Sequence, residues 1–208
     1  MTLVNSLQNH IENHSYPFNH WTIDQPLSQK AIDEIYRVKI PEGEVIFDGT
    51  RAGDKTGQDL LGKLRVYINR DNCNNFPELN NIIQEMRSHE CTKIISKMIE
   101  RDLNNSFVRL EVISDKDGFW LEPHCDIKEK LVSSIIFVNP FNESENLGTD
   151  FYDEKLNLVK TAPYKDNYGY FFTSGPNTWH GMEKKEIKKE RRCIQVNYVT
   201  FPTDWKVS

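Results

Sequence analysis

The chain has 208 residues, a length typical of a single domain. Hydrophobic residues make up 38% of it and aromatic residues 11%, so the chain can form a core, and intrinsic disorder is disfavoured. Its 26 basic and 31 acidic residues give a formal net charge of −5. A field of that sign disfavours nucleic acid and anionic membrane surfaces as general partners.

Targeting signals and cysteine motifs are not evident. Residues 1–20 lack the apolar stretch of a signal peptide, so we expect a cytoplasmic protein. The longest apolar run, residues 131–138, is too short to cross a bilayer, and no membrane partner is expected. Four cysteines without CxxC spacing predict reduced thiols rather than disulfides or a cysteine-rich zinc site. Nothing in the sequence indicates an oligomeric state.

The first half of the chain predicts a mixture of helix and strand, with two helical segments separated by a loop. Residues 27–37 place Ile32 and Ile35 at helical spacing, and residues 76–101 carry apolar residues that suit one or two amphipathic helices. Between them, residues 48–62 are polar and rich in glycine, which predicts a long loop. A binding lid and plain disorder are the two interpretations of that loop.

The second half predicts strands. Eight short segments rich in β-branched and aromatic residues follow one another without a helical pattern between them, at 106–113, 119–124, 131–138, 149–152, 156–161, 168–173, 178–183 and 191–199. This order predicts a mostly β fold with flanking helices, namely a double-stranded β-helix (jelly roll) with an N-terminal α-helical buttress. We expect one domain over 1–208, with a helical or mixed part at 1–105 and a jelly-roll core at 106–200.

Two histidines and an aspartate are the candidate metal ligands. His124 and Asp126 stand two apart at the end of a predicted strand, so both side chains leave the same face and Cys125 points the other way. His180 follows 54 residues after Asp126, and Arg191 lies 11 residues further on. Two imidazoles and one carboxylate with open positions form the facial triad of non-haem Fe(II) oxygenases.

Three segments of the chain resemble a known family. They are GFWLEPHCD at 118–126, WHGME at 179–183 and RRCIQVNY at 191–198. Their order and spacing are similar to those of the 2-oxoglutarate- and Fe(II)-dependent oxygenases, within the branch of prolyl 4-hydroxylase-like enzymes. The resemblance covers about residues 106–199.

The resemblance implies a ligand set and its cofactors. His124, Asp126 and His180 would be the catalytic iron ligands, and the family uses Fe(II), 2-oxoglutarate as co-substrate, O2 and, in some members, ascorbate as a reductant. The implied reaction is hydroxylation of an unactivated C–H bond with release of succinate and CO2. Because Asp126 keeps its carboxylate, hydroxylation is favoured over halogenation.

The resemblance also implies a co-substrate anchor. Arg191 would pair with the C5 carboxylate of 2-oxoglutarate, with Arg192 as the competing choice because strand alternation lets only one of the two face inward. Cys193 stands where many relatives have a serine that helps to hold this carboxylate, so that cofactor contact is weaker or absent. The tyrosine that assists co-substrate binding in some prolyl hydroxylases has no counterpart at 112–114.

Two other classes of function remain as alternatives. One is a cupin-like metal-binding module or isomerase without dioxygen chemistry, and the other is a non-catalytic β-sandwich for which the pattern is coincidence. The expected partner is a small-molecule or peptidyl substrate, and fold analogy does not choose between them.

Several further residues have both a structural and a functional interpretation. Arg109 and Glu111 share one strand face, where a structural ion pair is favoured over substrate recognition. Core filling is favoured over pocket lining for five aromatic residues, Phe119, Trp120, Phe137, Phe172 and Trp179. Exposed positions rather than a second metal site are expected for three N-terminal histidines, His10, His14 and His20.

Overall fold

The computed structural model describes residues 2–41 and 64–208. The loop predicted at 48–62 lies outside these residues. The described residues of the first half form four α-helices: α1 (Leu3–Asn9), α2 (Gln29–Arg37), α3 (Pro77–Arg87) and α4 (His89–Ile99).

Local sequence sets where the helices begin. The hydroxyl of Ser28 accepts a hydrogen bond from the backbone N–H of Ala31 and so caps α2. Ser88 caps α4 in the same way, and α3 begins with a proline at its first position, where no backbone donor is needed. The helices predicted over 27–37 and 76–101 are therefore confirmed, the second as a pair of helices that meet at Ser88.

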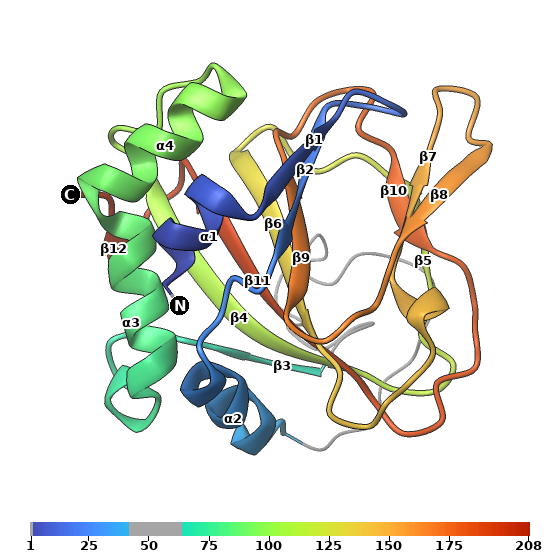
Figure 1. The fold of residues 1–208 in the computed structure, drawn as a ribbon, viewed down its shortest axis with the longest axis horizontal. Helices are drawn as coiled ribbons and strands as arrows, with labels where there is room; N and C mark the ends of the chain where they lie inside the picture. Colours follow the sequence, from blue (N-terminus) through green and yellow to red (C-terminus); the bar gives the residue numbers. More distant parts are fainter. Residues whose placement is uncertain (1, 42–63) are drawn as a thin grey trace.

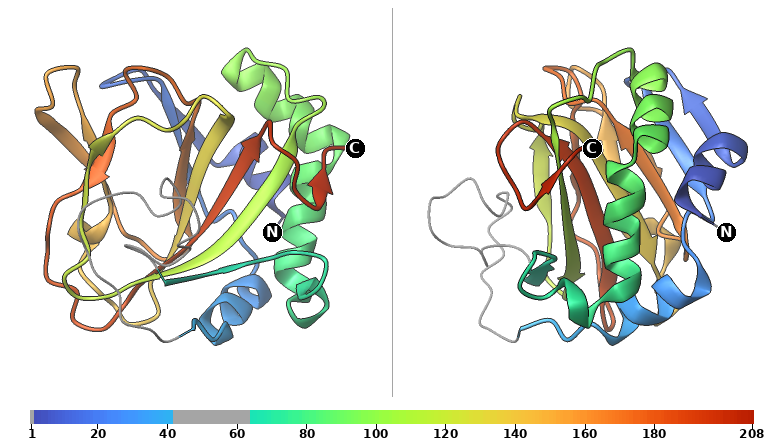
Figure 2. Two further views of the ribbon diagram at one scale, coloured as in Figure 1. Left: turned by 180° about the vertical axis from the view of Figure 1, so that it is seen from behind. Right: turned by 90° about the vertical axis from the view of Figure 1, so that its left-hand side faces the viewer.

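Twelve strands of the described chain form two antiparallel sheets. The larger sheet has the order β1 (Ile11–His14), β2 (His20–Asp24), β9 (Tyr168–Phe172), β6 (Lys130–Val138), β11 (Arg191–Val199), β4 (Phe107–Asp115) and β12 (Trp205–Lys206), and β3 (Leu64–Tyr67) pairs with β4. The smaller sheet has the order β5 (Leu121–His124), β10 (His180–Met182), β7 (Thr149–Tyr152) and β8 (Leu158–Ala162). Figures 1 and 2 show the helices on the outer face of the larger sheet and the smaller sheet on its other side.

This architecture confirms the predicted jelly roll with a helical buttress, with one correction. Three strands of the larger sheet, β1, β2 and β3, come from the first half of the chain, and β12 lies beyond residue 200. Their positions were not predicted, because each has at most five residues. β1 pairs with the neighbouring β2, but β2, β3 and β12 also pair with strands that lie far away in the sequence. β3, for example, has only four residues, and it pairs with β4 more than 40 residues later.

The larger sheet has an apolar core on each face. Val108, Leu110 and Val112 of β4 belong to the core that includes buried residues of the helices, such as Ile35 and Leu79. The alternate residues of β4 face the smaller sheet, as residues two apart in a strand share a face. That inner face carries Ile113, but also Arg109, Glu111 and Asp115, which are charged.

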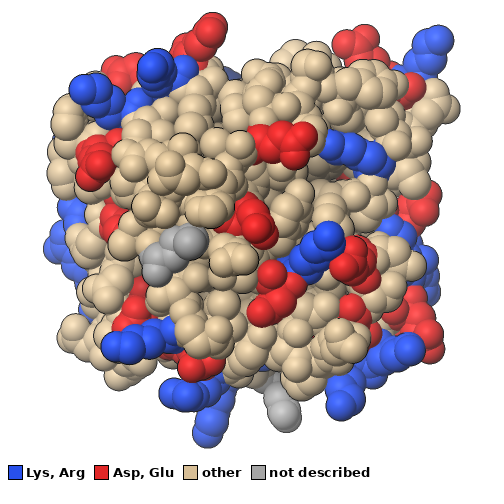
Figure 3. Space-filling model, viewed as in Figure 1, with Lys and Arg blue, Asp and Glu red and all other residues tan. Residues whose placement is uncertain are grey.

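Outside this interior, charges of both signs are mixed. Acidic and basic side chains are interspersed over the face shown in Figure 3. None of the helices in the described part of the chain is long and apolar enough to cross a membrane.

Candidate metal centre and its cavity

His124, Asp126 and His180 lie together between the two sheets. One ligand atom from each of the three side chains lies within 4.8 Å of those of the other two. His124 ends β5 and His180 begins β10, while Asp126 lies two residues beyond the end of β5 rather than in an extended strand. The chain thus brings together the three residues expected from the sequence, although Asp126 reaches the centre from a turn.

A glycine allows the two histidine strands to approach each other. His124 and His180 are directly opposite in the β5–β10 pairing, and their ring centroids are 4.3 Å apart. A Cβ atom on the next residue, Gly181, would lie 2.6 Å from the backbone oxygen of Leu121. Only glycine therefore fits at this position without moving one strand away from the other.

Backbone carbonyls set the orientation of both imidazoles. Nδ1 of His124 lies 2.8 Å from the carbonyl oxygen of Glu122, and Nδ1 of His180 lies 2.9 Å from that of Thr178. A carbonyl only accepts, so each neutral ring carries its proton on Nδ1 and leaves Nε2 with a lone pair. Such outer contacts are typical of metal-binding histidines.

Asp126 is held as a carboxylate. Burial alone would raise its pKa, but the charge of Lys130 holds the pKa well below its ordinary value. Lys130 Nζ donates to Oδ1 of Asp126 at 2.7 Å, and Oδ2 lies 3.7 Å from Nε2 of His180. Two imidazole nitrogens and an ionised carboxylate oxygen form a donor set that fits Fe(II).

Arg191 reaches the same cavity from β11. Its Nε donates to the carbonyl oxygen of Leu147 and its Nη1 to the carboxylate of Asp115, which lies opposite Arg191 in the β4–β11 pairing. Burial would lower the pKa of Arg191, but Asp115 raises it above its ordinary value, so the guanidinium stays charged. Nη2 donates to none of the described residues and is the donor left for a ligand.

Arg192 points to the opposite face of β11, as strand alternation requires. Its Nη1 donates to the carbonyl oxygens of Ile35, Tyr36 and Val38 at the C-terminal end of α2. A cation at this position satisfies carbonyls that a helix end leaves without partners. The structure thus gives Arg192 a helix-capping position and places Arg191 in the cavity wall.

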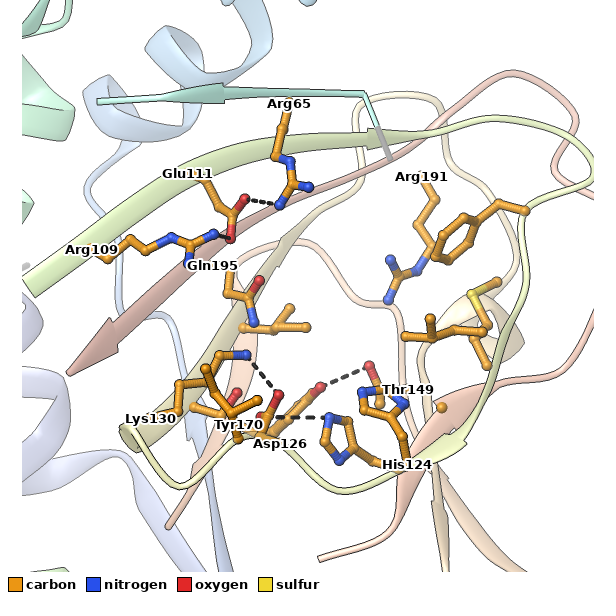
Figure 4. Close-up of a pocket in the computed structure, with 18 residues that line it drawn as sticks. Arg65, Arg109, Glu111, His124, Asp126, Lys130, Thr149, Tyr170, Arg191 and Gln195 are labelled. Carbon is orange, nitrogen blue, oxygen red and sulfur yellow. Dashed lines mark hydrogen bonds and ion pairs between the residues drawn. The ribbon is translucent and has the colours of Figure 1, made fainter. Parts of the chain in front are cut away.

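The cavity has a volume of about 130 Å³. It is lined by ligand, charged, polar and apolar side chains: Arg65, Arg109, Glu111, Phe119, Leu121, His124, Asp126, Ile127, Lys130, Ser133, Ile135, Thr149, Tyr170, His180, Gly181, Met182, Arg191 and Gln195. Figure 4 shows Arg109 and Arg191 on opposite sides of it, with Gln195 between them.

Several residues expected near the site have other positions. Cys193 shares the inner face of β11 with Arg191 but is buried in the core between the sheets and does not line the cavity. Cys125 is half-buried and does not line it either. Among the five aromatic candidates only Phe119 is part of the lining, while Phe137 and Phe172 lie behind it, against Arg191 and His180 respectively.

Three charged residues that pair with other charged residues of the cavity wall were not predicted from the sequence: Lys130, Asp115 and Arg65. Asp115 had a detectable signal, because it continues the two-residue spacing of Arg109 and Glu111 along a strand whose other face is apolar. Charged residues on the inner face of a two-sheet fold need partners or a ligand. Arg65 had no such signal, since its partner Glu111 is close to it only in the folded chain. Lys130 lies four residues after Asp126, a spacing that predicts a contact only within a helix.

Comparisons with known proteins place the fold. No family model matches the sequence, and no curated protein matches it. A prolyl-4-hydroxylase structure from Pseudomonas putida is 11% identical with a TM-score of 0.60, and the match covers 96% of this chain and 98% of that one. A Trichoplax adhaerens prolyl hydroxylase, solved with a hypoxia-inducible-factor peptide fragment, is 18% identical with a TM-score of 0.55, covering 96% and 88%.

A third structure, a prolyl 4-hydroxylase from Phytophthora capsici, is similar over a smaller part. It is 13% identical with a TM-score of 0.52, and the match covers 65% of this chain and 47% of that one. Identities this low carry the fold rather than the activity. The chain thus has the fold of these prolyl hydroxylase structures.

Proposed function

We propose that this protein is an Fe(II)- and 2-oxoglutarate-dependent dioxygenase that hydroxylates a C–H bond of its substrate. In this reaction one oxygen atom of O2 enters the substrate as a hydroxyl group, and the other enters succinate as 2-oxoglutarate loses CO2. The observation that carries the proposal is the triad of His124, Asp126 and His180 in a cavity that Arg191 also lines.

Each residue of the triad has a role that its contacts support. Nε2 of His124, Nε2 of His180 and the carboxylate of Asp126 would hold the iron, with the carbonyl contacts at the two Nδ1 atoms keeping both rings in place. Bound Fe(II) would supply the redox centre for activating O2. Lys130 holds one oxygen of Asp126, which favours binding of the metal through the other oxygen.

Arg191 is the proposed anchor for the C5 carboxylate of 2-oxoglutarate. A buried guanidinium is always charged and offers a planar donor edge that suits a carboxylate. This feature also separates the proposal from the cupin-like alternative, since a metal-binding module or isomerase without a keto-acid co-substrate has no need of a buried arginine beside its metal. The apolar side chains of Leu121, Ile135 and Met182 would exclude water from the reacting centre.

The substrate class stays open between a small molecule and a peptide. The Trichoplax adhaerens structure contains a peptide fragment, which supports a peptidyl substrate by analogy of fold alone. Use of ascorbate as a reductant is part of the same proposal.

Binding linkage tests the proposal without knowledge of the substrate. Mn(II), which takes similar ligands to Fe(II), and 2-oxoglutarate are added separately and together, and thermal unfolding is followed. We expect the pair to stabilise the protein more than the sum of the two alone, since 2-oxoglutarate would contact both the bound metal and Arg191. For scale, a ligand at about 100 times its Kd contributes roughly 2.7 kcal/mol.

His180→Ala is the variant for this test. It should abolish the joint effect of metal and 2-oxoglutarate, while the exposed His10→Ala variant should retain it. Equal stabilisation by 2-oxoglutarate with and without metal, or an unchanged joint effect in His180→Ala, would refute the proposed ligand set.

A further inference from the structure

A group of charged residues on β3 and β4 lines the cavity away from Arg191. Nη1 of Arg65 donates to Oε2 of Glu111 at 3.0 Å, and Nη2 of Arg109 lies 3.4 Å from Oε1 of the same carboxylate. Figure 4 shows this group beside Gln195, on the other side of the cavity from Arg191.

Within the described part of the chain, four cations of the cavity wall pair with three carboxylates. Among the described residues, Arg191 pairs with Asp115, Lys130 with Asp126 and Arg65 with Glu111, at three separate places in the wall. Among these described residues Arg109 has no carboxylate of its own, and it shares Glu111 with Arg65 through the other carboxylate oxygen. The charges of Fe(II) and dianionic 2-oxoglutarate would cancel each other and so would not remove the need of Arg109 for an anionic partner.

Arg109 is held in place before any ligand binds. Its Nη2 donates to the hydroxyl of Tyr67 at 2.6 Å, and its guanidinium carbon lies 4.8 Å from the centre of that ring. A cation stacked on an aromatic face loses less freedom when it binds a ligand. Nε and Nη1 donate to no described residue, and the side chain keeps 25% of its surface exposed.

We propose that Arg109 binds a carboxylate group of the primary substrate, so that this oxygenase acts on an acid. The inference rests on the proposed function, because it assumes that Arg191 and the metal hold 2-oxoglutarate on the opposite side. Glu111 keeps Arg65 and Arg109 together, and its charge disfavours a dianionic group at the same place. The carboxylate comes from a free acid or from an acidic side chain of a peptide.

The test uses the protein loaded with Mn(II) and saturating 2-oxoglutarate. Binding is measured by calorimetry or NMR for two pairs of ligands. One pair is propionate and propionamide, and the other is a blocked glycine–glutamate–glycine tripeptide and the same tripeptide with glutamine in place of glutamate. We expect at least one acid to bind about tenfold or more tightly than its amide, as charge-assisted hydrogen bonds predict. Tighter binding of the tripeptide than of propionate would identify a peptide as the source, and the reverse a free acid.

Variants assign the effect to Arg109. Arg109→Gln should remove the preference for acid over amide, and Arg109→Lys should keep part of it because the charge remains. The matched control is Arg101→Gln, at an exposed arginine outside the cavity, which should bind both acids as the wild type does. In all variants metal and 2-oxoglutarate should bind with unchanged affinity.

Two results would overturn the inference, and they differ from failure of the proposed function. One is equal binding of acids and amides by the wild type, and the other is an unchanged preference in Arg109→Gln. A protein that does not bind 2-oxoglutarate in the presence of metal would instead refute the oxygenase proposal. In that case the preference for acid over amide would be measured on the metal-free protein. Its presence would support the Arg109 site, and its absence would refute that site.

Discussion

Adjacent arginines on β11 show how one position in a strand separates a side chain that lines the cavity from one that caps a helix. Arg191 faces the cavity and Arg192 faces the end of α2, because successive residues of a strand point to opposite faces. Both are buried and charged, so composition alone does not distinguish them.

Replacing each arginine by glutamine should therefore have different effects. Arg191→Gln removes the charged donor near the metal centre and should raise the KM for 2-oxoglutarate by about 10–100-fold, the range expected for a hydrogen bond to a charged group. Arg192→Gln should leave that KM unchanged but reduce the free energy of unfolding by about 1–3 kcal/mol, since three carbonyls lose their donor.

Steady-state kinetics and denaturant unfolding of the two variants check this prediction. Because Arg191 is itself paired with Asp115, loss of stability is expected in both variants, and the kinetic comparison is the decisive one. A larger rise in KM for Arg192→Gln would transfer the anchor to Arg192.

At the scale of the element, the β5–β10 pair determines whether the proposed metal ligands His124 and His180 meet. The two strands have only four and three residues, and they carry His124 and His180 at directly opposed positions. Their close approach depends on Gly181, whose missing side chain leaves room for the backbone of β5.

Gly181→Ala should separate the strands. A Cβ atom 2.6 Å from the oxygen of Leu121 meets backbone rather than a flexible side chain, so we expect a loss of about 1–3 kcal/mol in unfolding free energy and weaker metal binding. The matched control is Gly175→Ala, where the nearest atom would lie 3.6 Å from the new Cβ, an ordinary contact. Calorimetric Mn(II) titration of both variants measures the effect, and equal metal affinity in the two would contradict it.

The strands also mark how far sequence can predict this fold. The β-rich second half, the helices and the spacing of His124, Asp126 and His180 follow from local patterns of residue type. Strands β2 and β3 do not follow from local patterns, because they pair with strands far away in the sequence. The contact of Lys130 with Asp126 does not either, because it spans a turn and not a helix. Arg109 and Glu111 were expected as an ion pair, and the structure shows that pair. The sequence does not show that their strand face lines the same cavity as His124, Asp126 and His180.

At the scale of the whole molecule, one buried histidine makes stability depend on pH. His20 was expected to be exposed, but its side chain is fully buried, and its ring packs against those of His14, Phe18 and Phe151. Burial lowers the pKa of His20 from 6.5 to about 4. Nδ1 lies 2.8 Å from the carbonyl oxygen of Phe18, and Nε2 is buried with no hydrogen-bond partner among the described residues.

Stability should consequently fall as the pH is lowered from about 6.5 to about 4. In that window the unfolded chain takes up a proton on His20 while the folded chain does not, which favours unfolding by about 1–3 kcal/mol in total. Above pH 6.5 the residue is neutral in both states and contributes no pH dependence.

His20→Phe should flatten this part of the pH profile, since phenylalanine does not titrate and suits the aromatic surroundings. Urea unfolding of wild type and variant at several pH values between 4 and 7 would measure the difference in slope. Identical slopes for the two proteins would show that other groups cause the acid sensitivity.

The proposed facial triad and the buried Arg191 would together hold Fe(II) and 2-oxoglutarate. Visible absorption under anaerobic conditions tests this proposal most directly, because a keto acid that chelates iron gives a weak charge-transfer band that neither component gives alone. We predict this band when Fe(II) and 2-oxoglutarate are both added to the wild type, and its loss in His180→Ala. Absence of the band in the wild type, together with no protection against thermal unfolding by the pair, would contradict the account.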